Sequence, residues 1–238
     1  MTRSRISSRW ILASVPLFAA AVLIGARTAK SGRVAVPTPP DTSAMALIAR
    51  GRQGVLSHGC GGCHGGLDDP SAAGWLAGKM SDDQVFAVGA CNVVHPDAKP
   101  CFKTYPRNLT PDNETGLGRF TERQIFNALR YGLRPEDTPD VDITSMTPGQ
   151  GNFPAHPRYL APPMPWPDWR HMDDADLWAI AAYLKRAVKP VHNRVVESEG
   201  PPDFWASAYA KLAGPYPPKP FPTENERVPD QNGAAPNH

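Results

Sequence analysis

The sequence contains two cysteines followed by a histidine, Cys60-Gly-Gly-Cys63-His64, in the C-x-x-C-H pattern of covalent haem attachment. Thiols three positions apart lie on one turn of the chain, so both can bond vinyl groups of a single porphyrin. The imidazole that follows can then bind the iron. Glycine at both middle positions lets the backbone approach the haem face. We therefore expect one haem c bonded to Cys60 and Cys63, with His64 as the proximal iron ligand.

Two other chemistries also use a C-x-x-C pair. A thioredoxin-like redox pair lies beside a βαβ pattern, and no such pattern surrounds residue 60. A structural zinc site needs four ligands, and the sequence has no second C-x-x-C to complete one. No nucleophile or acid–base constellation is visible elsewhere. These observations favour haem attachment and electron transfer over an enzyme.

Four further stretches have an informative order and spacing. They are Arg50-Gly51, NLTPDNETGLG at 108–118 with the following FTERQIFNALRYG, PPMPW at 162–166, and MDDADLWAIAAYL at 172–184. Together they resemble class I c-type cytochromes, most closely the haem domains of cytochrome c subunits of membrane-bound bacterial dehydrogenases. The resemblance implies an all-α cytochrome c fold, with three to five helices around one haem. It also implies that Gly51 packs against an aromatic residue of the last helix, Tyr183 or Trp178.

The resemblance further implies that Met164, in the PPMPW stretch, is the distal iron ligand. A thioether is uncharged and soft, so it favours ferrous iron, and Met/His ligation raises the reduction potential. Most methionines only fill cores, so other ligands stay open. Met172 is the second choice, and the remaining candidates are Met146, Met80, His156 and His171. Ligation by a second histidine would lower the potential.

Cys91 and Cys101 depart from the pattern of the family. Phe102 follows Cys101, so neither cysteine begins a second haem motif. In an oxidising compartment two spare thiols usually pair. We expect a Cys91–Cys101 disulfide that restrains an insertion beside the haem.

The N-terminus indicates export. Residues 10–26 form an apolar run of 17 residues, between the lengths of a signal-peptide core and a spanning helix. Residues 1–33 hold six basic and no acidic residues, which helps orient a membrane segment, while 19 basic and 23 acidic groups leave the rest at a formal −4. Because a clean A-x-A site is missing, we expect an inner-membrane anchor at 10–26, with a cleaved signal peptide as the alternative. Either places the domain in the periplasm, and no basic patch indicates nucleic acid.

Hydrophobic periodicity predicts helices joined by long proline-rich loops, and no strand. The expected helices cover residues 43–58, 81–89, 121–131, 173–187 and 203–213, the last docking its aromatic residues on the domain. Capping boxes are expected at Ser81 with Gln84 and at Thr121 with Gln124, and Gly132 is expected to end the third helix. The expected domains are a signal peptide or membrane anchor over 1–30, a linker over 31–42, the cytochrome c haem domain over 43–190 and a proline-rich tail over 191–238.

The motif and the resemblance together predict a periplasmic monohaem cytochrome c that carries single electrons. It acts either as a free carrier or as the electron-transfer subunit of a dehydrogenase complex. The expected partners are a dehydrogenase as donor and a cytochrome or oxidase as acceptor. A haem enzyme or gas sensor is the alternative, and it would need an iron with an open sixth position. Residues that could line the pocket or donate to the haem propionates are Trp75, Arg107, Asn108, Tyr159, Trp166 and Trp169.

Overall fold

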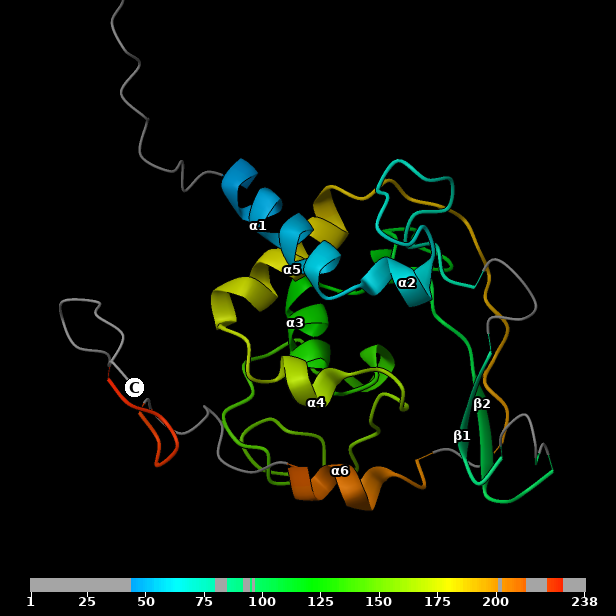
Figure 1. Ribbon diagram of the computed structural model, residues 1–238, viewed down its shortest axis with the longest axis vertical. Helices are drawn as coiled ribbons and strands as arrows, with labels where there is room; N and C mark the ends of the chain where they lie inside the picture. The colour runs from blue at the N-terminus through cyan, green and yellow to red at the C-terminus, as the bar shows by residue number, and fades with distance from the viewer. Residues whose placement is uncertain are drawn as a thin grey trace, which may run out of the picture. The chain divides into compact units, whose positions relative to one another are not determined.

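The computed structural model describes residues 44–79, 85–91, 95, 97–200, 203–212 and 222–228. The expected membrane segment, the linker and Met80 lie outside these residues. The helices are α1 (Ala44–Ser57), α2 (Cys60–His64), α3 (Glu122–Tyr131), α4 (Trp166–Trp169), α5 (Asp174–Arg186) and α6 (Ala206–Leu212), with 3-10 turns at Leu117–Arg119 and Pro135–Asp137 (Figure 1). The strands are β1 (Phe86–Gly89) and β2 (Cys101–Thr104). None of the described helices combines the length and apolar character that crossing a bilayer requires.

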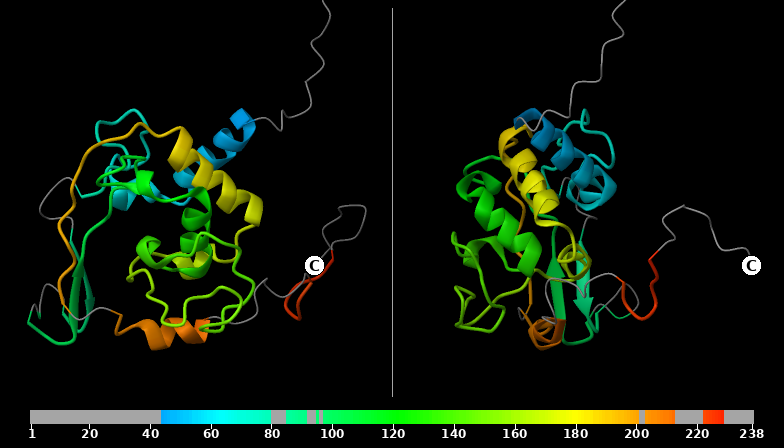
Figure 2. Two further views of the ribbon diagram at one scale, coloured as in Figure 1. Left: turned by 180° about the vertical axis from the view of Figure 1, so that it is seen from behind. Right: turned by 90° about the vertical axis from the view of Figure 1, so that its left-hand side faces the viewer.

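The main core lies where α1 and α3 pack against α5 (Figures 1 and 2). At Gly51 of α1, a Cβ atom would sit 1.9 Å from the carbonyl oxygen of Ala179 and 2.8 Å from Cβ of Tyr183. Only glycine lets the two helices approach so closely. The expected contact between Gly51 and Tyr183 is therefore confirmed. Trp178 instead stacks on Phe126 of α3, with ring centroids 4.5 Å apart.

The ends of α3 follow the local signals. The Thr121 side chain accepts a hydrogen bond from the Gln124 backbone, and the Gln124 side chain accepts one from the Thr121 backbone, so the capping box is confirmed. Gly132 follows the helix with φ 67°, which is the left-handed conformation that favours glycine. A Cβ atom at Gly132 would also lie 2.2 Å from the ring of Trp166. The same glycine therefore leaves room for Trp166, the first residue of α4, to pack here.

The helix expected over residues 81–89 is wrong in its second half. Phe86–Gly89 is a strand that pairs antiparallel with Cys101–Thr104, and Gly89 faces Cys101. The expected capping residues Ser81 and Gln84 lie outside the described residues. Valine and phenylalanine at 85, 86 and 88 suit a strand, and a non-local partner decides between the two conformations. Over the described residues, the fold is accordingly mostly helical with one small two-stranded sheet, rather than all-α.

A second apolar cluster lies beside α6. Its buried members are Phe102, Tyr131, Leu133, Ile143, Phe153, Tyr159, Trp166 and Trp205. The Trp205 ring lies 5.0 Å from that of Phe102, so the aromatic docking expected for this helix is confirmed. The segment after α5 also packs on the domain, because the Asn193 side chain donates to the carbonyl oxygens of Ala77 (2.7 Å) and Lys79 (3.0 Å).

A disulfide joins Cys91 to Cys101, with an S–S distance of 2.06 Å, and closes the loop between β1 and β2. We expect the Cys91→Ala/Cys101→Ala variant to unfold with a free energy lower by about 2–4 kcal/mol, because the unfolded chain loses a loop restraint. Chemical denaturation followed by circular dichroism measures this change. An unchanged unfolding midpoint would show that the hairpin is held by its strand pairing alone.

Candidate haem-binding site

A cavity of about 610 Å³ lies among α2, α3, the segment before α4, the β1–β2 hairpin and residues 194–198. This volume is within the range of small-molecule and cofactor sites. The lining includes the four residues expected to hold a haem: Cys60, Cys63, His64 and Met164. The fold therefore brings Met164 to the same cavity as a motif about 100 residues earlier in the sequence. Much of the remaining wall is apolar, and includes Phe102, Leu109, Phe120, Leu129, Ile180 and Leu184.

The haem motif forms the single helical turn α2. The turn puts Cys60 and Cys63 on one stretch of cavity wall, with Cys60 half-buried and Cys63 exposed. Both thiols are free. The two middle glycines differ in their surroundings. A Cβ atom at Gly61 would meet the Leu67 carbonyl oxygen at 2.0 Å, whereas one at Gly62 would meet nothing within 4 Å. Packing of the chain on itself therefore requires glycine at 61, and not at 62.

The His64 imidazole is oriented by the backbone of Arg107. Nδ1 lies 2.7 Å from the Arg107 carbonyl oxygen. Because a carbonyl oxygen only accepts, Nδ1 must carry the proton, which leaves Nε2 with a free lone pair. Burial lowers the pKa of His64 and outweighs the opposite effect of this hydrogen bond. A neutral imidazole with one nitrogen held by a carbonyl is the form that ligates metals.

The electrostatics of Cys60 disfavour a thioredoxin-like redox pair. Burial is the main cause that raises the pKa of the Cys60 thiol, to about 11. Reactive redox cysteines have pKa values below that of a free thiol, because the thiolate is the nucleophile. A thiol protonated at neutral pH is instead consistent with a residue that serves as a covalent attachment point. Over the residues that the structure describes, no three His, Cys, Asp or Glu side chains gather to hold a metal ion.

Met164 lies on a turn just before α4, about 100 residues after the C-x-x-C-H motif in the sequence. Its N–H donates to the Ala161 carbonyl oxygen at 3.0 Å, and its half-buried side chain packs against the main core. Among the described methionines, Met164 is the one that lines the cavity. Met172 packs against the core away from the cavity lining, and Met146 belongs to the second cluster. The histidine candidates, His156 and His171, are exposed and do not line the cavity.

Charged residues also line the cavity, and sequence reasoning singled out only Arg107 among them. They are five arginines and three glutamates from segments far apart in the chain, namely Arg107, Arg119, Arg134, Arg158, Arg194, Glu114, Glu136 and Glu197. Each arginine forms an ion pair with an acidic residue: Arg107 with Glu197, Arg119 with Glu136, Arg134 with Asp203, Arg158 with Asp137, and Arg194 with Glu114. Guanidinium groups bind carboxylates well, so a cofactor with carboxylate arms would share these arginines with their present acidic partners. Only Arg107 carried a sequence signal, through its place beside the 108–118 stretch.

The other candidate pocket residues divide into two groups. Trp169 and Asn108 line the cavity, whereas Trp75, Tyr159 and Trp166 do not. The amide nitrogen of Asn108 already donates to Thr115 Oγ1 (3.0 Å) and to the Val191 carbonyl oxygen (2.8 Å). Asn108 therefore holds the 108–118 loop against the segment after α5.

Comparison with known proteins gives a consistent set of relatives, although no family model matches the chain. The chain is 27% identical, over 68% of its length, to the cytochrome c subunit of a quinone-dependent alcohol dehydrogenase from Gluconacetobacter polyoxogenes. It is 26% identical, over 71% of its length, to the fructose dehydrogenase cytochrome subunit of Gluconobacter japonicus. A third relative, the gluconate 2-dehydrogenase cytochrome c subunit of Pantoea cypripedii, is also 26% identical, over 68% of the chain.

These alignments cover 26%, 27% and 28% of the three relatives, so the chain spans about a quarter of their length. All three relatives are the cytochrome subunits of dehydrogenases. The identities support a relationship between this chain and the cytochrome c subunits of dehydrogenases, whose role is electron transfer.

Proposed function

We propose that this chain is a periplasmic monohaem cytochrome c that transfers single electrons from a dehydrogenase to a downstream acceptor. The observation that carries the proposal is the shared cavity: the C-x-x-C-H motif and Met164 line one largely apolar space of about 610 Å³. In this proposal Cys60 and Cys63 hold a haem c through thioethers, and His64 and Met164 are its axial ligands. The haem iron supplies a one-electron couple when bound.

The surrounding residues account for the proposed chemistry. Burial favours the neutral His64 imidazole, and the Arg107 carbonyl orients it. The apolar wall excludes water and disfavours the extra charge of the ferric state, and the neutral thioether of Met164 acts in the same direction. Both effects raise the reduction potential. If His64 and Met164 both bound the iron, no position would be left for a substrate, which favours a carrier over a haem enzyme or sensor.

The proposed route for electrons is through the exposed side of α2. Cys63 and Gly62 are exposed there, so this edge of the cavity reaches the surface. A partner can approach this edge without contacting Met164, which lies on a different segment of the cavity wall. We propose a dehydrogenase as donor and a cytochrome or oxidase as acceptor, because the relatives are named as subunits of dehydrogenases. The Cys91–Cys101 disulfide and the apolar run at 10–26 support a periplasmic domain anchored to the inner membrane.

Purified, exported protein tests the proposal directly. We expect the denatured chain to keep one haem by mass spectrometry and its ferric form to show the weak red absorption band of methionine ligation. The ferrous form is expected not to bind carbon monoxide, because Met164 fills the sixth position. Extraction of the haem into acidic organic solvent would refute covalent attachment. Rapid carbon monoxide binding would favour the sensor instead. The same mass distinguishes an uncleaved anchor from a cleaved signal peptide.

A further inference from the structure

The segment that carries Met164 is poorly suited to hold its own shape. Residues 160–169 contain four prolines, at positions 162, 163, 165 and 167. Proline has no N–H to donate, so the segment forms few internal hydrogen bonds. Those within it run from Met164 to Ala161 and from Asp168 and Trp169 to Pro165. Apart from the packing of its side chain on the core, the position of Met164 therefore depends on what holds the two ends of the segment.

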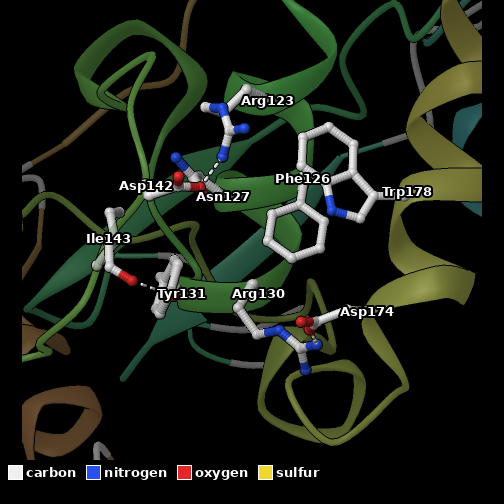
Figure 3. Close-up of a pocket in the computed structure, with 9 residues that line it drawn as sticks. All are labelled: Arg123, Phe126, Asn127, Arg130, Tyr131, Asp142, Ile143, Asp174 and Trp178. Atoms are coloured by element: carbon white, nitrogen blue, oxygen red, sulfur yellow. Dashed lines mark hydrogen bonds and ion pairs between the residues drawn. The ribbon is translucent and has the colours of Figure 1, made fainter.

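The end after α4 is held by Arg130, in the last turn of α3. The Arg130 side chain is 2% exposed, and its Nη1 donates to the carbonyl oxygens of Arg170 (2.6 Å) and Met172 (2.7 Å). Its Nη2 pairs with Asp174 at the start of α5, as Figure 3 shows. Arg130 thus joins α3 to the chain on both sides of the α4–α5 junction.

The end of the segment before Met164 is held by Arg134, which lies four residues after Arg130 in the sequence. Its Nε donates to the Tyr159 carbonyl oxygen at 3.1 Å, and its Nη2 pairs with Asp203 at 2.9 Å. Backbone bonds reinforce this end, since Leu160 donates to the Gly132 carbonyl oxygen at 2.7 Å. Residues 130–134 therefore contact the chain on both sides of Met164.

We propose that Arg130 and Arg134 are positioning residues that clamp the two ends of the Met164 segment and keep the thioether at the iron. This inference rests on the proposed function, in which Met164 is the distal ligand. The clamp sets how easily another ligand displaces Met164, because displacement requires the segment to move away. Neither arginine needs to touch the cofactor for this role, although Arg134 also lines the cavity.

Imidazole added to the ferric holoprotein measures the clamp, because it competes with Met164 and bleaches the red band. We expect Arg130→Met and Arg134→Met to bind imidazole about tenfold or more tightly than the wild type, since each variant loses charge-assisted bonds that hold the segment. Arg130→Lys is expected to lie between Arg130→Met and the wild type. The matched control is Arg123→Met, because Arg123 is on α3 and pairs with Asp142, away from the segment.

The outcomes separate this inference from the proposed function. A wild-type holoprotein without the red band would refute Met164 ligation, and the clamp with it. A wild type with the band, together with wild-type imidazole affinity in both Arg130→Met and Arg134→Met, would overturn the clamp alone. An equal gain in affinity in Arg123→Met would also overturn it, because general loosening of α3 would then be the cause. If Arg130→Met does not fold, the more exposed Arg134 position decides the matter, since its side chain is 22% exposed.

Discussion

A chain with the substitutions Cys60→Ala and Cys63→Ala is expected to carry no covalently bound haem and to lose electron transfer. Both thioethers are removed, and His64 alone would hold the cofactor on this side. The expected loss of bound haem is complete, because without both thioether bonds the haem dissociates from the site. Haem-stained denaturing gels and intact mass measure it, with single variants expected to retain less haem than the wild type.

The matched control removes the other two cysteines. The Cys91→Ala/Cys101→Ala variant loses the same number of cysteines, yet it is expected to keep its haem, because in the wild type these two sulfurs bond to each other. Haem that stays with the denatured Cys60→Ala/Cys63→Ala chain would contradict the proposed attachment. Loss of haem only in the control would instead point to attachment through the hairpin.

The Met164→Ala variant is expected to keep its haem but to lose the red band of the ferric form. Its reduction potential is expected to fall by roughly 0.1–0.3 V, part of the range of about 0.8 V that axial ligands span. Loss of the soft thioether removes the preference for ferrous iron, and water or another donor takes its place. The ferrous variant is expected to gain carbon monoxide binding. Redox titration and absorption spectra of the purified protein measure these changes.

Met172→Ala is the control for Met164→Ala. Met172 is also partly buried against the core, but it does not line the cavity, so its removal is expected to leave the band and the potential near wild-type values. Its backbone carbonyl, which Arg130 binds, is unchanged by the substitution. If Met172→Ala loses the band while Met164→Ala keeps it, the distal ligand is Met172.

Local signals in the sequence were sufficient for several elements. The capping box at Thr121 and Gln124 and the glycine at 132 define both ends of α3, because each signal acts within one turn of the helix. The contact of Gly51 with Tyr183 was expected from family resemblance rather than from local physics. The structure shows its reason, which is a backbone approach that leaves no room for Cβ.

The strand at Phe86–Gly89 was missed because its partner lies elsewhere in the sequence. The strand pairs with Cys101–Thr104, which lies beyond the loop that the disulfide closes, whereas the capping pattern before it favoured a helix by local rules. Four arginines of the cavity wall, Arg119, Arg134, Arg158 and Arg194, were missed for a related reason. Arg194 and Glu114, for example, form an ion pair across 80 residues of sequence, and no periodicity marks such a pair.

By itself, the sequence determined the attachment chemistry that we expect, because C-x-x-C-H places two thiols and an imidazole within one turn whatever surrounds it. Only the tertiary structure decided that Met164, rather than Met172, shares a cavity with that turn. It alone also showed that the Arg107 carbonyl orients His64 and that Arg130 and Arg134 hold the Met164 segment. The physical reason is the range of the interactions: neighbouring positions set the motif, whereas contacts between distant residues arise only when the helices pack.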